Sequence, residues 1–147
     1  MKILVLSDSH QQSLNSDFVK QYDAVFHCGD YGISRGILEQ NKAYYVAGNC
    51  DVLGAKELVI RWKGRTVLLT HGHLESVKYG FDRLVYKALD YEVSVVFFGH
   101  THRQTVFEED GILFVNPGAY PDSYAEITDE ALYLHQQGKI RKMLFKW

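Results

Sequence analysis

The sequence predicts an α/β protein, in part α+β, built as a two-sheet β-sandwich flanked by helices. Two patterns support this class. The first two-thirds of the chain alternates short apolar runs with glycine-containing polar loops and with helical stretches, whereas the last third has the alternation of β-hairpins. A chain of 147 residues is long enough to bury a sizeable core, so we expect a single domain over residues 1–147.

Five apolar runs predict strands, and each run leads into a loop that carries polar side chains. The runs and their loops are 2–6 with SDSH, 24–26 with HCGD, 43–46 with AGNCD, 66–69 with THGH, and 93–98 with GHTH. Because these runs are apolar on consecutive positions, they suit strands that are covered on both faces. We expect the loops after their carboxyl ends to gather at one edge of a first sheet.

Three stretches between the strands predict helices. Leu14, Phe18 and Tyr22 recur at helical spacing. Ser34 is placed to cap a second helix that buries residues 37 and 38. The third helix would connect the strands that begin near residues 66 and 93, and it has the clearest amphipathic stripe: Phe81, Leu84, Val85, Ala88 and Leu89.

Hairpin signals complete the predicted fold. Residues 57–71 predict two strands joined at Lys63 and Gly64. Residues 104–115 predict a hairpin around Asp110 and Gly111, and residues 131–145 predict another around Gln137 and Gly138. We expect these last two hairpins to form the second sheet.

The composition excludes several function classes. A hydrophobic fraction of 46%, a charged fraction of 23% and a net charge of -2 argue against a binder of long nucleic acid, which normally has a basic face. No run approaches the roughly 20 apolar residues that cross a bilayer. Cys28 and Cys50 form no CxxC motif, so we expect a cytoplasmic protein. The ten tyrosines leave a homo-oligomer interface open.

Side chains that can bind metal follow every one of the five predicted strands. Each alone would be an ordinary turn residue or a buried histidine, but together they occupy five successive strand exits. On extended backbone, side chains two residues apart point the same way, so each Asp-x-His or His-x-His pair would face one site. The candidate ligands are Asp8, His10, Asp30, Asn49, His71, His100 and His102.

The number and type of these ligands predict two divalent metal ions. Four imidazoles, two carboxylates and an amide oxygen are too many for one tetrahedral ion and suit two ions that share Asp30. Two such ions and two aspartates leave a charge of about +2, which suits an anionic substrate. A shell of nitrogen and oxygen favours Mn, Zn, Fe, Ni or Co over Mg, and Mn is our first expectation.

The order of these residues resembles the signature of the calcineurin-like metallophosphoesterase superfamily. The matching blocks, which span residues 8–102, are D-x-H at 8–10, G-D at 29–30, G-N-x-D at 48–51, H at 71 and G-H-x-H at 99–102. The HCGD, GNCD and THGH loops and NPGA at 116–119 resemble most closely the small bacterial and archaeal phosphodiesterase branch. This resemblance implies the calcineurin-like metallophosphoesterase fold, a two-sheet sandwich flanked by helices.

The resemblance also implies roles for individual residues. One metal would be bound by Asp8, His10, Asp30 and His102. The other would be bound by Asp30, Asn49, His71 and His100. Catalytic roles would fall to Asp30, Asn49, Cys50 and Asp51, and substrate contacts to Asn49, His73 and Arg103.

Cys50 departs from the family pattern. Many members have a histidine here, which contacts the phosphate and is thought to protonate the leaving group. Because a thiol is a weak hydrogen-bond donor, we expect diesters with good leaving groups to be hydrolysed and alkyl esters to react slowly.

The sequence thus predicts a two-metal-dependent phosphoesterase, in first place a phosphodiesterase, in which a metal-bridging hydroxide attacks phosphorus in line. Its partner would be a small phosphate-ester substrate. The alternatives are a non-catalytic protein-interaction scaffold that retains the metal site, and a phosphomonoesterase or nuclease that uses the same metals.

Overall fold

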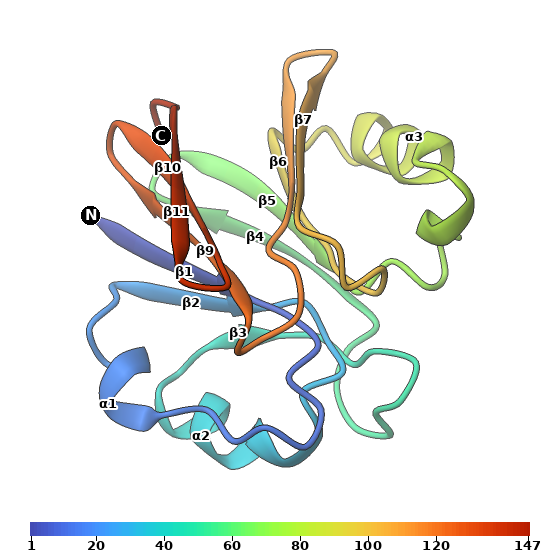
Figure 1. Ribbon diagram of the computed structural model, residues 1–147. Helices are drawn as coiled ribbons and strands as arrows, with labels where there is room; N and C mark the ends of the chain where they lie inside the picture. Colours follow the sequence, from blue (N-terminus) through green and yellow to red (C-terminus); the bar gives the residue numbers. More distant parts are fainter.

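The computed structural model describes all residues from 1 to 147 and consists of two mixed β-sheets packed face to face, which confirms the predicted fold class (Figure 1). The six-stranded sheet contains β1 Lys2–Leu6, β2 Ala24–His27, β3 Tyr44–Tyr45, β9 Ser123–Thr128, β10 Ala131–Gln136 and β11 Lys139–Leu144. The five-stranded sheet contains β4 Glu57–Trp62, β5 Arg65–Thr70, β6 Val95–Phe97, β7 Thr105–Glu109 and β8 Ile112–Asn116.

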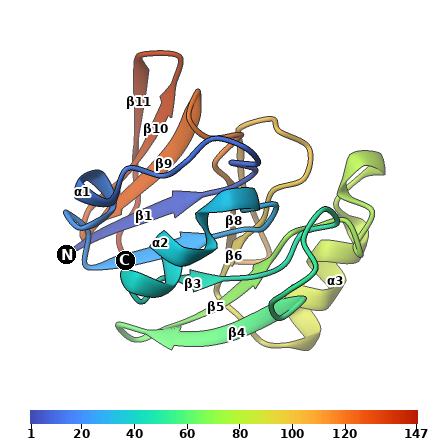
Figure 2. The same cartoon turned by 90° about the horizontal axis from the view of Figure 1, so that it is seen from below.

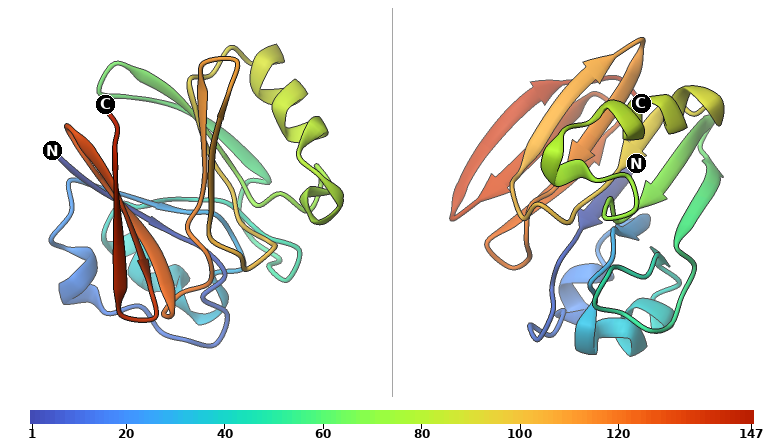
Figure 3. Two further views of the ribbon diagram at one scale, coloured as in Figure 1. Left: turned by 45° about the horizontal axis from the view of Figure 1, so that its top comes forward. Right: turned by 90° about the vertical axis from the view of Figure 1, so that its right-hand side faces the viewer.

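The helices lie on the outer faces of the sandwich. They are α1 Ser16–Val19, α2 Arg35–Gln40 and α3 Asp82–Asp90, with the short 3₁₀ helices η1 Gly32–Ser34 and η2 Val77–Tyr79. Figures 1 and 3 show α1 and α2 beside the six-stranded sheet and α3 on the far side of the five-stranded sheet. None of these helices has the length and apolar character needed to cross a membrane.

The distribution of strands between the two sheets differs from the prediction. The strand order is β11-β10-β9-β1-β2-β3 in one sheet and β4-β5-β6-β8-β7 in the other, so the five strand exits do not share one sheet (Figure 2). The two C-terminal hairpins do not form a sheet of their own either. β8 pairs with β6, whereas β10 pairs with β9, a strand that was not predicted and that joins the hairpin to β1.

Apolar residues on consecutive positions of β1 pack on both faces of its sheet. Ile3 and Val5 lie in the central core between the sheets, and Leu4 and Leu6 lie in the outer core beneath α1 and α2. β6 follows the same rule, with alternate residues in the central core and in the core beneath α3. This confirms the interpretation of these runs as strands covered on both faces.

The first two helices differ in detail from the prediction. α1 has only four residues, and it begins after Leu14 because Asn15 caps it and accepts hydrogen bonds from the amides of Asp17 (2.9 Å) and Phe18 (3.2 Å). Ser34 precedes α2 as predicted, but its side chain does not cap the helix. Its Oγ instead accepts a hydrogen bond from the amide of Leu14 at 3.3 Å and so joins two loops.

α3 is the crossover between the parallel strands β5 and β6, as predicted. Leu84, Val85 and Ala88 are buried against the five-stranded sheet. Leu89, the last member of the predicted stripe, is 43% exposed and lies on the solvent side. The apolar face of α3 is therefore narrower than the sequence indicates.

Candidate metal centre

The predicted ligands come from the exits of strands in both sheets. Asp8 follows β1 and Asp30 follows β2 in the six-stranded sheet, whereas His71 follows β5 and His100 lies beyond β6 in the five-stranded sheet. The backbone joins these loops, since the amide of Asp8 donates to the carbonyl of Gly29 and the amide of Gly99 donates to that of His71. The site therefore lies where the ends of the two sheets meet.

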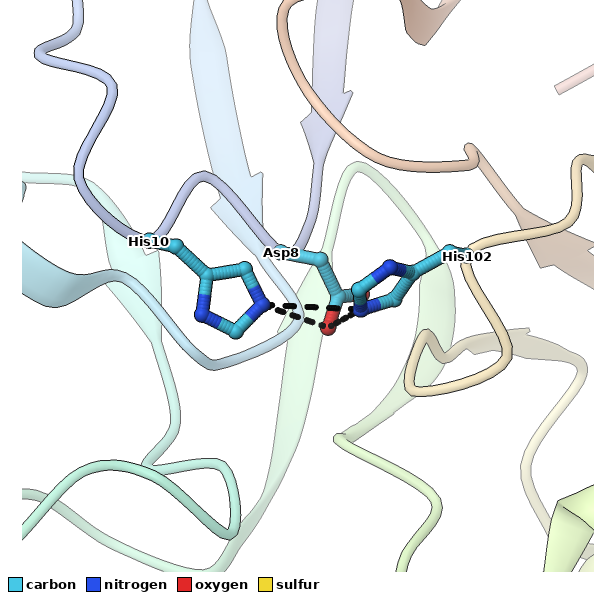
Figure 4. Close-up of side chains that lie close together, drawn as sticks. All are labelled: Asp8, His10 and His102. Atoms are coloured by element: carbon cyan, nitrogen blue, oxygen red, sulfur yellow. Dashed lines mark hydrogen bonds and ion pairs between the residues drawn. The ribbon is translucent and has the colours of Figure 1, made fainter.

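Asp8 lies at the centre of one group of side chains. Its Oδ1 is 3.2 Å from His102 Nε2 and 3.9 Å from His10 Nε2, and Figure 4 shows both rings directed at this oxygen. Its Oδ2 accepts hydrogen bonds from Ser7 Oγ at 2.5 Å and from the amide of His100 at 3.1 Å. Oδ1, in contrast, is buried and has no hydrogen-bond partner.

His71 lies at the centre of a second group. Its Nδ1 donates to the carbonyl of Cys28 at 2.8 Å, which directs Nε2 into the site. Burial lowers the pKa of His71, but the hydrogen bond to Asp30 and the charges of Asp8 and Asp30 raise it overall, so a bound metal ion would replace the Nε2 proton. That Nε2 is 3.0 Å from Asn49 Oδ1 and 3.2 Å from His100 Nδ1. A backbone carbonyl that orients the far nitrogen of a histidine is the usual support for a metal-binding imidazole.

Asp30 lies between the two groups. Its Oδ2 is 3.8 Å from His10 Nε2 and 3.3 Å from His71 Nε2, and its Oδ1 accepts a hydrogen bond from the amide of Cys50 at 2.9 Å. Burial of this carboxylate opposes its charge, but the hydrogen bonds from His71 and Cys50 outweigh burial and hold the pKa of Asp30 well below its usual range. Asp30 is therefore ionised at neutral pH.

The donor atoms in these groups suit divalent ions. They are imidazole nitrogens, carboxylate oxygens and an amide oxygen, which are ligands for Mn, Zn, Fe, Co and Ni. A buried carboxylate oxygen without a hydrogen bond, such as Asp8 Oδ1, is costly unless a cation binds it. The residues present therefore fit the metal ions that the sequence implies.

The ligand pairs do not lie on extended backbone, as the sequence argument assumed. Five of the eleven non-glycine residues with positive φ are candidate ligands: Asp8 (53°), His10 (47°), Asp30 (54°), His100 (72°) and His102 (61°). The left-handed conformation costs an L-residue roughly 1–2 kcal/mol, and such residues cluster at functional sites. At the exits of β1, β2 and β6, the ligand side chains are therefore directed by left-handed residues.

Two glycines allow the loops to approach each other closely. A Cβ on Gly48 would lie 2.1 Å from Asp30 Oδ1, and a Cβ on Gly99 would lie 2.0 Å from Ser7 Oγ and 2.7 Å from Asp8 Oδ2. Neither contact is compatible with a side chain at the glycine. Both glycines therefore provide the space in which the two aspartates are held.

Cys50 and Asp51 have different surroundings. The Cys50 side chain is exposed, and its Sγ lies within 4.8 Å of ligand atoms of His10 and Asp30. Partial loss of solvent around the thiol and the negative charge of Asp30 raise the pKa of Cys50, so it stays protonated at neutral pH. The Asp51 carboxylate accepts hydrogen bonds from the amides of Gly48 (2.9 Å) and Tyr31 (3.2 Å), so it supports the loops.

His73 and Arg103 lie at the border of the site. The ring of His73 is 5.4 Å from that of His71 and 6.0 Å from that of His100, and its buried Nδ1 has no hydrogen-bond partner. Burial and the neighbouring His71 lower the pKa of His73. Arg103 is exposed and lines a cleft of about 620 Å³ beside the loop that carries His100 and His102.

Asn116 is a supporting residue whose role the sequence did not reveal. Its buried Nδ2 donates to the carbonyl of Gly99 at 3.2 Å and to Thr101 Oγ1 at 2.9 Å, so it holds the turn that carries His100 and His102. Its Oδ1 accepts a hydrogen bond from the amide of Gly118 at 3.0 Å. The NPGA motif was the available signal, but composition alone indicated only a turn.

His27 supports the loop that leads to Asp30. Its Nδ1 accepts a hydrogen bond from the amide of Gly29 at 3.1 Å, and its Nε2 lies 2.9 Å from Ser9 Oγ. Ser9 Oγ donates to the carbonyl of Tyr31, so it accepts the proton on His27 Nε2. Burial, reinforced by the neighbouring His71, lowers the pKa of His27 to about 3, and the ring is neutral at pH 7.

Comparison with known proteins agrees with this architecture. The sequence-family model of the calcineurin-like phosphoesterase superfamily domain matches residues 1–138 of this chain. A probable metallophosphoesterase of Bacillus subtilis, YsnB, is 31% identical over 144 residues, which cover 88% of this chain and 85% of that protein. These similarities place the chain among the phosphoester hydrolases. It belongs to the calcineurin-like phosphoesterase superfamily, which confirms the resemblance seen in the sequence.

Solved structures show the same fold. A predicted phosphoesterase from Streptococcus pneumoniae superimposes with a TM-score of 0.77 at 28% identity and covers 98% of this chain and 97% of its own. Vps29 from Entamoeba histolytica, solved in complex with Zn²⁺, superimposes with a TM-score of 0.76 at 23% identity and covers 99% of this chain and 98% of its own.

Proposed function

We propose that this protein is a single-domain, two-metal phosphodiesterase that acts on a small phosphate ester in the cytoplasm. The observation that carries the proposal is that Nε2 atoms of His10, His71 and His102 lie 3.9, 3.7 and 3.2 Å from the buried, unpartnered Asp8 Oδ1. Family membership supports phosphoester hydrolysis, and the two free cysteines, Cys28 and Cys50, suit a reducing compartment. We also propose that the protein can form a homo-oligomer.

The ligand assignment follows the two groups of side chains. One ion would be held by Asp8, His10, Asp30 and His102. The other would be held by Asp30, Asn49, His71 and His100. When bound, two divalent ions supply a hydroxide nucleophile at neutral pH and positive charge for the phosphoryl oxygens. Mn²⁺ is our first expectation, with Zn, Fe, Ni and Co as alternatives, and the Zn²⁺ complex of Vps29 supports a divalent ion in this fold.

The protein's own residues would orient the substrate and move protons. Asn49 borders the centre and would contact both metal and phosphate, and Cys50 would present a protonated but weak donor to the leaving oxygen. Asp51 would keep the loop of both residues in place through its hydrogen bonds to backbone amides. His73 and Arg103 would contact the substrate around the phosphoryl group.

A diester fits this site better than a monoester. A monoester carries a second negative charge on the phosphoryl group itself, and a preference for it would need cationic side chains beside the ligands. Arg103 is the one cationic side chain proposed to contact the phosphoryl group, and the cleft that contains Asp8, His10 and His102 is lined by no lysine or arginine. A nuclease acting on long chains would need an extended basic face, which a net charge of -2 does not suggest.

A non-catalytic interaction scaffold is the alternative from a different class. The specific observation that favours it is the similarity of the whole fold to Vps29, together with a thiol in place of the expected general acid. Against it, a scaffold gains nothing evident from five left-handed residues and a buried, unpaired carboxylate oxygen at one end of the fold.

Hydrolysis of bis(4-nitrophenyl) phosphate by Mn²⁺-reconstituted protein tests the proposal. We expect release of nitrophenol that requires Mn²⁺, together with about two metal ions per chain by elemental analysis, and loss of activity in Asn49→Ala. Asn41→Ala, which changes the same residue type at the end of α2, is the matched control and should remain active. Protein that binds metal but hydrolyses no diester, monoester or cyclic nucleotide would favour the scaffold instead.

A further inference from the structure

Two clefts border the candidate metal centre at residues 101–103. The first, of about 620 Å³, lies between η2 and the loop from β6 to β7, and Thr101 and Arg103 line it. The second, of about 450 Å³, includes Asp8 and His102 in its lining and extends to Tyr120. Both volumes are in the range of small-molecule sites, so each cleft has room for one arm of a substrate joined at the centre.

The first cleft is cationic. Two positive side chains and two hydroxyl groups line it, and no carboxylate does. Its polar and apolar lining residues are Val77, Lys78, Phe81, Thr101, Arg103 and Thr105. Guanidinium, ammonium and hydroxyl groups are the side chains with which proteins bind phosphate.

Lys78 and Arg103 are exposed, and neither forms an ion pair within the protein. Lys78 lies in η2, which borders the same cleft as Arg103. The backbone of Arg103 is fixed on both sides, since its amide donates to Thr101 Oγ1 at 3.1 Å and its carbonyl accepts from Thr105 Oγ1 at 3.0 Å. Two cations without ion-pair partners therefore line the cleft beside the site.

The cleft also has a rigid apolar wall. The ring of Phe81 packs 5.0 Å from that of Phe107 and 5.6 Å from that of Phe98. Val77 is buried behind the loop of His71, where its amide donates to the carbonyl of Gly72 at 3.2 Å. The wall suits the carbon skeleton of a substrate arm that carries its charge at the far end.

The second cleft has the opposite character. Gln11, Gln12, Tyr120 and Asp122 line it beyond the metal ligands, and it contains no lysine or arginine. An anionic group would find no cation there and would face the carboxylate of Asp122. The second cleft is therefore suited to an uncharged arm.

We propose that the substrate is a phosphodiester with one arm that carries a second phosphate, and that this phosphate binds Lys78 and Arg103 in the first cleft. The uncharged arm then occupies the second cleft. The inference rests on the proposed phosphodiesterase function and adds to it the class of substrate and the direction in which it binds.

A matched pair of substrates tests the inference. Thymidine 5′-(4-nitrophenyl phosphate) and its 3′-phosphorylated counterpart differ only in the second phosphate. With Mn²⁺-reconstituted protein we expect kcat/KM to be about tenfold higher for the 3′-phosphorylated ester, mainly through a lower KM, since two charge-assisted contacts are gained. Lys78→Gln should reduce this preference about threefold and leave the rate for the unphosphorylated ester unchanged, and Arg103→Gln should reduce the preference about threefold as well.

Lys63→Gln is the matched control, because Lys63 lies at the β4–β5 turn, at the opposite end of β5 from His71. It removes the same charge from the protein and should keep the full preference. Equal kcat/KM for the two esters, or a preference that Lys63→Gln lowers as much as Lys78→Gln does, would overturn the inference.

Binding to metal-free protein separates this inference from the proposed function. In EDTA, thymidine 3′,5′-bisphosphate should bind with a Kd at least about fivefold lower in wild type than in the Lys78→Gln/Arg103→Gln variant, as measured by isothermal titration calorimetry. If this difference is found but no diester is hydrolysed, the proposed function fails and the anion site stands. If diesters are hydrolysed but wild type and variant bind the bisphosphate equally, the anion site fails and the function stands.

Discussion

Replacement of His27 should remove a large part of the acid sensitivity of the metal-free protein. His27 is fully buried, and its Nδ1 accepts a hydrogen bond from the amide of Gly29, so protonation would break this bond and place a charge in the core. Its pKa is about 3 in the folded protein, compared with about 6.5 in an unfolded chain. Between these values the unfolded state binds more protons, so stability falls as the pH falls.

The size of the effect follows from the two pKa values. Between pH 7 and pH 5 an unfolded histidine becomes protonated and folded His27 does not, which lowers the free energy of unfolding by about 2 kcal/mol. Urea unfolding followed by circular dichroism, at both pH values and with EDTA present, measures this difference. His27→Asn retains an oxygen that can accept a hydrogen bond from the amide of Gly29, but its side chain does not titrate. The decrease in the free energy of unfolding from pH 7 to pH 5 should therefore be about 2 kcal/mol smaller in this variant than in wild type.

A control separates this effect from simple destabilisation. Val25→Ala also removes atoms from a buried side chain of β2, where Val25 is 4% exposed, but it removes no titratable group. It should lower stability at both pH values and keep the wild-type difference between them. The reasoning is refuted if His27→Asn loses as much stability between pH 7 and pH 5 as wild type does.

Three further variants test the fold and the site. Gly99→Ala should lower the free energy of unfolding by about 1–3 kcal/mol and weaken Mn²⁺ binding, because its Cβ would overlap Ser7 Oγ, whereas Gly36→Ala, with open space around its Cβ, should not destabilise. Phe97→Ala should cost about 3–5 kcal/mol in urea unfolding, since Phe97 is fully buried in the central core, and Tyr86→Ala on the exposed face of α3 should cost under about 0.5 kcal/mol. Cys50→His should raise the rate for phenyl esters at least about tenfold more than for 4-nitrophenyl esters, and equal gains would contradict a role in leaving-group protonation.

The sequence predicted the elements of the fold better than their partners. Consecutive apolar residues identified β1 and β6 because each strand contacts a core on both faces, and that property is local. Pairing is not local. β9 lies between β1 and β10, and its alternating buried and half-buried pattern does not show which strand edges it joins. The sequence therefore predicted the two layers and the sharing of one sheet by β1, β2 and β3, but it assigned β5 and β6 to the wrong sheet.

The candidate site shows the same division. The order of ligand types after five strands was enough to predict that these side chains converge, because parallel strands deliver their exits to one end. The left-handed backbone of His100 and His102 was not predicted, since the local sequence does not specify it and distant contacts hold it. Asn116, which donates to Gly99 from 17 residues away, is one such contact.

Because Asp8 and Asp30 belong to one sheet and His71 and His100 to the other, the candidate centre has a mechanical consequence. Bound metal ions would cross-link the two sheets at one end of the sandwich, opposite the end that the β4–β5 turn occupies. Chelation would remove this cross-link, while the apolar core would still hold the two sheets together. Local unfolding should then begin in the ligand loops. After EDTA treatment, amide hydrogen exchange should therefore become faster at the C-terminal ends of β1 and β5 before it does so at their N-terminal ends.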